Sequence, residues 1–185
     1  MQIGHQYGTD FNPRYSSYLT NMLNKVYNGG GQDNGQTLAQ IFSQVGMKTG
    51  IPSGLLAAIA AQESGGTWGA HGGGMMQVTG NHNHNAYQNA MAGAQVLLGK
   101  INMLVNKGVI PANWQGNQNA LAKIIEAYNG DANFMTKNNS WTSIPNAGYA
   151  ASVLDNWKII NSGSAGSMLQ FNITIPAGTI PGNQF

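Results

Sequence analysis

The chain lacks cysteine, has few charged residues and contains no long apolar run. Without cysteine it has no disulfide, no thiolate nucleophile and no Cys-based zinc site. Charged residues make up 8% of its 185 residues, against roughly 25% in typical soluble domains. Because only 6 residues are acidic, any catalytic carboxylate must be sought among very few side chains.

Neither a membrane span nor an export signal is visible in the sequence. No apolar stretch approaches the roughly 20 residues that a transmembrane helix needs. The N-terminal segment MQIGHQYGTDFNPR lacks the basic start and apolar run of a signal peptide. The formal net charge of +2 is too small for a nucleic-acid footprint, which requires clustered Lys and Arg. We therefore expect no nucleic-acid partner, although an anionic polymer such as a cell wall is compatible with this charge.

Helical periodicity dominates the chain. Hydrophobic residues reach 42%, enough for a globular core, and they recur at helical spacing in six segments. These predicted helices cover about residues 15–26, 37–45, 52–63, 86–105, 121–128 and 147–157. Thr37 is the expected N-cap of the second segment, Pro52 suits the first turn of the third, and Gly65 and Gly130 suit helix ends.

Two segments depart from this helical pattern. Residues 65–80 form a glycine-rich loop, in which we expect a small hairpin around MMQVT. After a flexible Gly/Ser linker, the alternation of Leu169, Phe171, Ile173 and Ile175 predicts a β-like C-terminal tail. The predicted organisation is an N-terminal helical extension (1–35), an α-rich domain (36–161), and a linker with the tail (162–185).

Glu63 is the first candidate for chemistry. Ile59 and Leu56 precede it by four and seven residues, so its carboxylate shares their apolar helix face. Burial and the negative end of the helix dipole both disfavour the anion and should raise its pKa. A carboxylic acid of this kind can protonate the leaving oxygen of a glycosidic bond. The alternative interpretation is a helix-end glutamate that faces water.

Three further motifs follow in order: GMMQV at residues 74–78, AYNGD at 127–131 and GYAASVLDNW at 148–157. Together with AQESG at 61–65, they resemble motifs of the goose-type lysozymes and soluble lytic transglycosylases. The resemblance covers roughly residues 51–160 and implies a mainly α, lysozyme-like fold. Each motif is weak by itself, but their common order on predicted helices makes the resemblance specific.

The resemblance implies roles for individual residues. Glu63 would be the catalytic acid, or acid and base in turn, and Ser64 would support the site beside it. Met76 and Gln77 would line the sugar groove.

The later motifs add Tyr128 to fix the glutamate, Asn129 to bind substrate and Tyr149 to face the cleft. Spacing alone allows other interpretations: Tyr128 as a core residue, Asn129 as a helix C-cap and Tyr149 as packing. No cofactor is implied.

The chain departs from this family pattern where acidic residues usually position water. The corresponding loops carry Ala70, His71 and Thr79, and Thr67 occupies the place of a family asparagine. The resemblance to hydrolytic members is weakened by this lack, because hydrolysis uses a second carboxylate.

Two other acids need consideration. Glu126 is predicted to face solvent beside Lys123, which leaves Asp131 as the nearby candidate for holding water. A lytic transglycosylase needs no such acid, since the 6-hydroxyl of the sugar itself attacks. The sequence therefore favours transglycosylation.

Two glycine- and histidine-rich stretches carry weaker signals. His82 and His84 could share a metal, but no third ligand is visible nearby, so a polar loop is the default interpretation. The triple glycine at 72–74 lacks the Lys and Ser/Thr of a phosphate loop.

The resulting hypothesis is a muramidase that cleaves peptidoglycan glycan strands between N-acetylmuramic acid and N-acetylglucosamine, without metal or cofactor. The lack of an export signal, the low charge and the tail suggest a phage virion component that acts in the host cell wall and binds other virion proteins through its tail. The alternatives are a hydrolytic goose-type endolysin, a secretion-system lytic enzyme, and a non-catalytic wall-binding or structural subunit on a decayed lysozyme scaffold.

Overall fold

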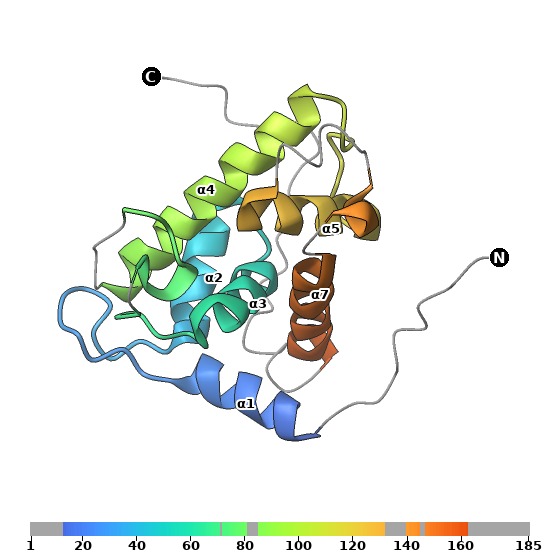
Figure 1. Cartoon of the computed structure of the whole chain (residues 1–185). Helices are drawn as coiled ribbons and strands as arrows, with labels where there is room; N and C mark the ends of the chain where they lie inside the picture. The colour runs from blue at the N-terminus through green and yellow to red at the C-terminus, as the bar shows by residue number, and fades with distance from the viewer. Residues whose placement is uncertain (1–12, 71, 81–84, 132–139, 145–146, 163–185) are drawn as a thin grey trace, which may run out of the picture.

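The computed structural model describes residues 13–162 of the chain, except 71, 81–84, 132–139 and 145–146 (Figure 1). The helices are α1 (Pro13–Asn24), α2 (Leu38–Thr49), α3 (Ser53–Ser64), α4 (Ala86–Asn106), α5 (Gln118–Glu126) and α7 (Ala147–Ser162). Shorter helical turns are η1 (Gly74–Met76), η2 (Ala127–Asp131) and η3 (Trp141–Ser143). The prediction of a mainly helical fold is therefore confirmed for the described residues.

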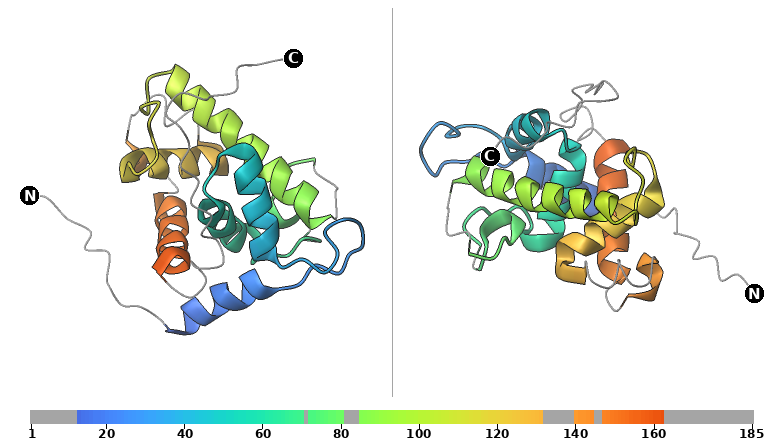
Figure 2. Two further views of the ribbon diagram at one scale, coloured as in Figure 1. Left: turned by 180° about the vertical axis from the view of Figure 1, so that it is seen from behind. Right: turned by 90° about the horizontal axis from the view of Figure 1, so that it is seen from above.

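Helix α3 forms the centre of the molecule. Figures 1 and 2 show α2 and α4 on one side of it, α7 on the other and α1 along one edge. Residues 53–60 of α3 are all buried, as expected for a helix that is apolar on every side. Small residues let α7 approach closely: a Cβ on Gly54 would lie 3.0 Å from Trp157 Nε1. The Asn156 amide adds a hydrogen bond of 3.3 Å to the Ala58 carbonyl.

The helix ends follow the predicted capping residues. Thr37 caps α2 through a reciprocal pair with Gln40: its hydroxyl accepts from the Gln40 N–H at 3.2 Å, and the Gln40 side chain accepts from the Thr37 N–H at 2.8 Å. Gly65 ends α3 in the left-handed conformation, with φ of 64°. The prediction of a helix start at Ala86 is confirmed too, with Asn85 as its N-cap.

The predicted hairpin around MMQVT is wrong. Residues 74–76 form the helical turn η1, and the β-contact in the described part of the chain is an isolated bridge between Val26 and Thr37. A strand would alternate buried and exposed side chains, whereas Met75 and Met76 are both buried. Gln77, with φ of 50°, then turns the chain out of extended geometry.

The N-terminal helix belongs to the same core as the rest of the described chain. Leu19, Met22 and Leu23 of α1 are buried in one hydrophobic cluster with α2, α3, α4, α5 and α7. Val26, expected on the same apolar stripe, lies beyond the helix end and is 49% exposed. None of the described helices combines the length and apolarity needed to cross a bilayer. The predicted strand at 169–175 lies outside the described residues.

Candidate active site

Glu63 lies in the last turn of the central helix α3. The helix closes behind it through two backbone hydrogen bonds, from the Gly65 N–H to Ala61 and from the Gly66 N–H to Ala60, each 3.2 Å. The Glu63 side chain is half-buried. It therefore sits at the negative end of a buried helix, where the charged carboxylate is disfavoured.

Tyr149, from the first turn of α7, holds this carboxylate. Its hydroxyl donates a hydrogen bond to Glu63 Oε1. Burial raises the pKa of Glu63 above its ordinary value of 4.5, and the bond from Tyr149 lowers it in part. Burial, reinforced by the bond to Glu63, also raises the pKa of Tyr149. Tyr149 thus remains a proton donor in its hydrogen bond while Glu63 can take up and release a proton.

Glu126 holds the end of α7 that carries Tyr149. The prediction that Glu126 faces solvent is wrong, because its side chain is fully buried. Its Oε1 accepts a hydrogen bond of 2.8 Å from the Ala150 N–H in the first turn of α7, a place that favours negative charge. Lys123 is buried as well and donates to the Val109 carbonyl at 3.1 Å; burial lowers its pKa.

Met76 contributes to the site through its backbone. The resemblance placed it in the lining of the groove, but its side chain is fully buried, and a Cβ on Gly93 would lie 2.6 Å from its Cβ. Its N–H donates to Asn89 Oδ1 at 3.1 Å, and its carbonyl accepts from the Tyr128 hydroxyl at 2.6 Å. The backbone of η1 is thereby fixed between α4 and η2.

Tyr128 makes a different contact from the one that the resemblance implies. Tyr128 was expected to fix the glutamate, but its hydroxyl donates to Met76, and Tyr149 makes the bond to Glu63. The Glu63 carboxylate nevertheless affects Tyr128. Burial raises the pKa of Tyr128 most, and the negative charge of Glu63 raises it further. Asn129 follows it in η2 and is half-buried.

Ser64 and Gln77 shape the loop between α3 and α4. The Ser64 hydroxyl donates to the Met75 carbonyl at 2.8 Å and accepts from the Thr67 N–H at 3.1 Å. Gln77 is the one non-glycine residue of the described chain with positive φ, and its amide donates to the Gly74 carbonyl at 2.7 Å. The turn at Gln77 is therefore held within the segment 74–77 itself.

Asn89 is a structural residue of the site that the sequence reasoning missed. It is fully buried on α4 and holds the Met76 N–H. Gly74 must be glycine to accommodate it, because a Cβ there would overlap the Asn89 amide and its φ is +67°. The signal was present in the sequence: Asn89 lies in phase with the apolar residues Ala86 and Gly93, where a polar side chain needs a buried partner.

Apart from Glu63, the described carboxylates do not offer a solvent-facing acid beside it. Asp33 and Glu126 are buried, and Asp155 pairs with Lys158 at 3.5 Å on the surface. No group of three or more His, Asp or Glu among the described residues could hold a metal. His71, His82, His84 and the Asp131 side chain lie outside what the structure describes.

Comparisons with models of protein families, with curated proteins and with solved structures give no match. The chemistry must therefore be inferred from the site itself. Glu63 is a titratable acid at the end of a buried helix, held by a phenol that stays protonated. Such a group can give a proton to a substrate oxygen and take one back.

Proposed function

We propose that this protein is a peptidoglycan-cleaving muramidase of lysozyme-like fold, acting as a lytic transglycosylase. Its substrate is the β-1,4 bond between N-acetylmuramic acid and N-acetylglucosamine. The observation that carries the proposal is the half-buried Glu63, whose pKa is raised by burial while Tyr149 holds its carboxylate in one orientation. The order of the four motifs around it supports the same substrate class.

Glu63 acts first as acid and then as base in the proposed reaction. Protonated Glu63 donates its proton to the glycosidic oxygen, and the bond from this oxygen to C1 of N-acetylmuramic acid breaks. The resulting carboxylate removes the proton from the 6-hydroxyl of the same sugar. That oxygen attacks C1, which forms the 1,6-anhydro ring and returns Glu63 to its acid form. The Tyr149 hydroxyl stabilises the carboxylate between these steps.

The scarcity of carboxylates supports transglycosylation over hydrolysis. A hydrolytic mechanism needs a second group to activate water. Ala70 and Thr79 occupy loop positions where such acids are expected, and Glu126 is buried with Oε1 bonded to the backbone of α7. An intramolecular attack by the 6-hydroxyl requires no second carboxylate.

The Glu63→Gln variant tests the catalytic assignment. Glutamine keeps the size of the side chain and can accept from Tyr149, but its amide has no acidic proton to transfer to the leaving oxygen. Clearing of purified sacculi should fall by about 10²–10⁴-fold, the usual contribution of a general acid, while circular dichroism stays unchanged. Clearing at the rate of the parent protein would remove Glu63 from the mechanism.

The products distinguish the two reactions. Muropeptides released by the parent protein should end in 1,6-anhydro-N-acetylmuramic acid, which mass spectrometry separates from a hydrolytic product by one water. Reducing ends throughout would identify a hydrolase. A protein that binds sacculi but releases nothing would instead be the non-catalytic wall-binding subunit.

We further propose that the protein is carried in a phage virion and opens the host cell wall during entry. The low charge and the alternating tail support this role, because such a tail can pair with the sheet edge of another virion protein. The truncation experiment described in the Discussion tests this part of the proposal separately from catalysis.

A further inference from the structure

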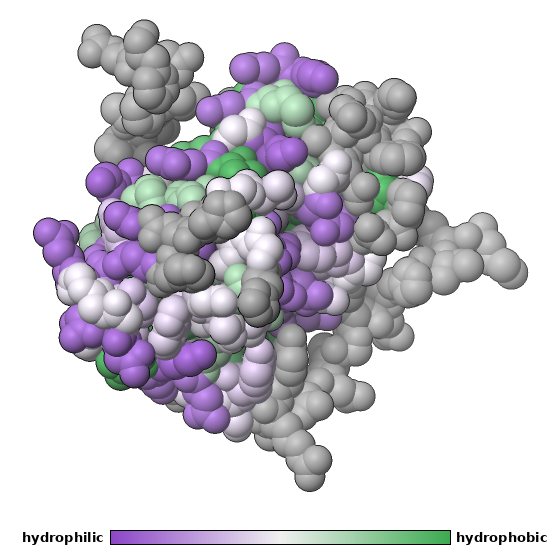
Figure 3. Space-filling model, turned by 60° about the vertical axis from the view of Figure 1, so that its left-hand side comes forward, coloured by the Kyte–Doolittle hydropathy of each residue, from purple (hydrophilic) through white to green (hydrophobic). Residues whose placement is uncertain are grey.

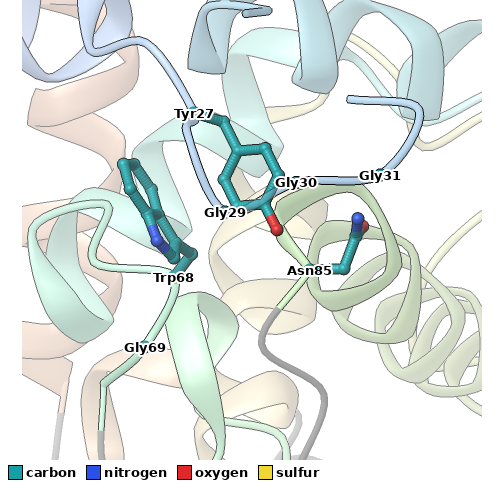
Figure 4. Close-up of a pocket in the computed structure, with 7 residues that line it drawn as sticks. All are labelled: Tyr27, Gly29, Gly30, Gly31, Trp68, Gly69 and Asn85. Atoms are coloured by element: carbon teal, nitrogen blue, oxygen red, sulfur yellow. The ribbon is translucent and has the colours of Figure 1, made fainter. Parts of the chain in front are cut away.

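A hollow of about 480 Å³ lies next to the loop that follows Glu63. Its walls are Tyr27, the glycine run at 29–31, the adjacent loop around Trp68, and Asn85 at the start of α4 (Figure 4). None of the motif residues around Glu63 belongs to these walls. The volume falls within the roughly 300–1,000 Å³ that small-ligand sites commonly have.

Tyr27 directs its hydroxyl into this hollow. Its side chain is only 2% exposed, yet its hydroxyl makes no hydrogen bond within the described part of the chain. Figure 4 shows the hydroxyl directed toward the space between the glycine run and Asn85. Because this hydroxyl opens on the hollow and can both donate and accept, a ligand there can form a hydrogen bond with it.

The glycines keep that hydroxyl accessible. A Cβ on Gly29 would overlap the Tyr27 hydroxyl and ring. Gly30 and Gly31 have φ of 83° and 81°, a conformation that other residues rarely adopt. The Asn85 amide nitrogen faces the same turn, at 3.4 Å from where a Cβ of Gly31 would be. Side chains in this run would fill the hollow.

The aromatic wall is held in place from two sides. Trp68 packs on Tyr27 in an edge-to-face arrangement, with ring centroids 5.2 Å apart and planes at 81°. The Lys25 ammonium lies 4.6 Å from the centre of the Trp68 ring. The half-buried indole is therefore fixed in orientation before any ligand binds.

The turn opposite Trp68 is anchored as well. The Tyr27 N–H donates to the Gln36 carbonyl and the Gly35 N–H to the Tyr27 carbonyl, each at 2.8 Å. Asp33 accepts from the Tyr87 N–H at 3.2 Å and so ties this segment to α4. A preformed site loses little freedom when it binds a ligand.

The lining chemistry fits a neutral, hydroxylated ligand with one apolar face. The walls combine two aromatic rings, a phenol hydroxyl, an amide and peptide groups, and carry no charged side chain. A pyranose ring matches this set, because its C–H face can lie on an aromatic ring while its hydroxyl or N-acetyl groups reach the polar atoms. Where Figure 3 is coloured, its hydrophobic areas are small and lie among hydrophilic ones.

We propose that this hollow is a second saccharide-binding site, which takes an N-acetylated sugar of the same glycan strand that Glu63 cleaves. The choice of this glycan as the occupant rests on the proposed function. The observation of the hollow and of the Tyr27 hydroxyl in it is independent of that function. By binding the strand away from the cleaved bond, the site would keep the protein on its polymeric substrate.

Binding is tested in the Glu63→Gln background, in which the ligand is not consumed. The probe is a peptide-free tetrasaccharide of alternating N-acetylglucosamine and N-acetylmuramic acid, titrated by calorimetry and by NMR of the tryptophan indole N–H groups. The Trp68 signal should shift on titration. Tyr27→Phe, which removes one hydroxyl, should weaken binding by about 2- to 10-fold, and Trp68→Ala by about tenfold or more. Tyr87→Phe removes a hydroxyl outside the hollow and serves as the control.

Two results would overturn the proposal: an unmoved Trp68 signal at saturating probe, or parent-like affinity in both Tyr27→Phe and Trp68→Ala. The failure of the two proposals is distinguishable. If Glu63→Gln still clears sacculi, the catalytic assignment fails while the binding result stands by itself. If Glu63→Gln is inactive and Trp68 does not respond, only the second site is lost.

Discussion

Glu63 is subject to two opposing influences on its pKa. Burial raises the pKa, and the hydrogen bond that Tyr149 donates lowers it by favouring the carboxylate. A group that must be an acid in one step and a base in the next needs both its protonated and its charged form to be accessible. Tyr149 is therefore both the residue that orients Glu63 and one that adjusts its proton affinity.

We expect Tyr149→Phe to move the alkaline limb of the rate profile to higher pH. The substitution removes the hydrogen bond that lowers the pKa of Glu63 and leaves burial to raise it further. Since the first step requires protonated Glu63, cleavage would persist to higher pH, although with a lower maximal rate. The measurement is clearing of sacculi as a function of pH.

Tyr128→Phe is the matched control for this experiment. Its hydroxyl donates to the Met76 carbonyl and makes no hydrogen bond to Glu63, so the position of the limb should stay where it is in the parent protein. An equal displacement in both variants would show that the limb reports general loosening of the site.

The raised pKa of Glu63 also makes stability depend on pH. In the folded protein Glu63 holds its proton more tightly than in the unfolded chain, whose pKa is near 4.5. Its favourable contribution is therefore complete below that pH and is lost as pH rises through the folded pKa. We expect Glu63→Gln to unfold at higher denaturant than the parent protein near neutral pH. The measurement is denaturant unfolding of both proteins between about pH 4 and pH 8. If their free energies of unfolding changed in parallel with pH, the expectation would be wrong.

The turn at residues 74–77 depends on α4 for its conformation. Asn89 binds the Met76 N–H, and the Met76 carbonyl in turn receives the Tyr128 hydroxyl. Gly74 permits this arrangement because it brings no side chain against the Asn89 amide. The segment with the least regular backbone beside Glu63 is thus supported by buried hydrogen bonds from two helical elements.

A comparison of Gly74→Ala with Gly72→Ala isolates this support. Both glycines have positive φ, 67° and 89°, so either substitution introduces strain of about 1–2 kcal/mol. Only Gly74→Ala also displaces Asn89, because the nearest atom to a Cβ on Gly72 is Gln77 Oε1 at 3.4 Å. Loss of the hydrogen bond between Asn89 and the Met76 N–H should destabilise Gly74→Ala by about 1–3 kcal/mol more. Thermal unfolding measures the difference, and equal losses would exclude a specific role for Asn89.

Ile160 on α7 is the last buried core residue of the described chain. The Gly/Ser-rich stretch that follows α7 predicts that the tail is separate from this core. On this prediction, truncation after Gly163 should leave thermal unfolding and clearing of sacculi nearly unchanged. It should abolish incorporation of the protein into a virion or a partner complex.

Truncation after Trp157 is the control for that experiment. It removes the fully buried Ile160, so the unfolding temperature should fall. If truncation after Gly163 already lowers the unfolding temperature or the activity, the tail is part of the folded domain and not an assembly segment.

The helices and their ends could be read from the sequence because they depend on local interactions. Apolar residues at helical spacing predicted the central helix, Thr37 predicted a cap, and Gly65 predicted the stop directly after Glu63 and Ser64. The spacing to Leu56 and Ile59 also indicated that the Glu63 carboxylate would be partly buried. Each of these features involves residues within about two turns of one another.

Contacts between distant segments were decided only by the tertiary structure. Tyr149 reaches Glu63 from 86 positions away, so which of two motif tyrosines bonds to the carboxylate depends on how α7 packs against α3. Glu126 was expected to face solvent beside Lys123, yet it is buried and accepts a hydrogen bond from the first turn of α7. Helical periodicity gives the face on which a side chain lies, but not which element covers that face. That choice is made by packing of the whole core.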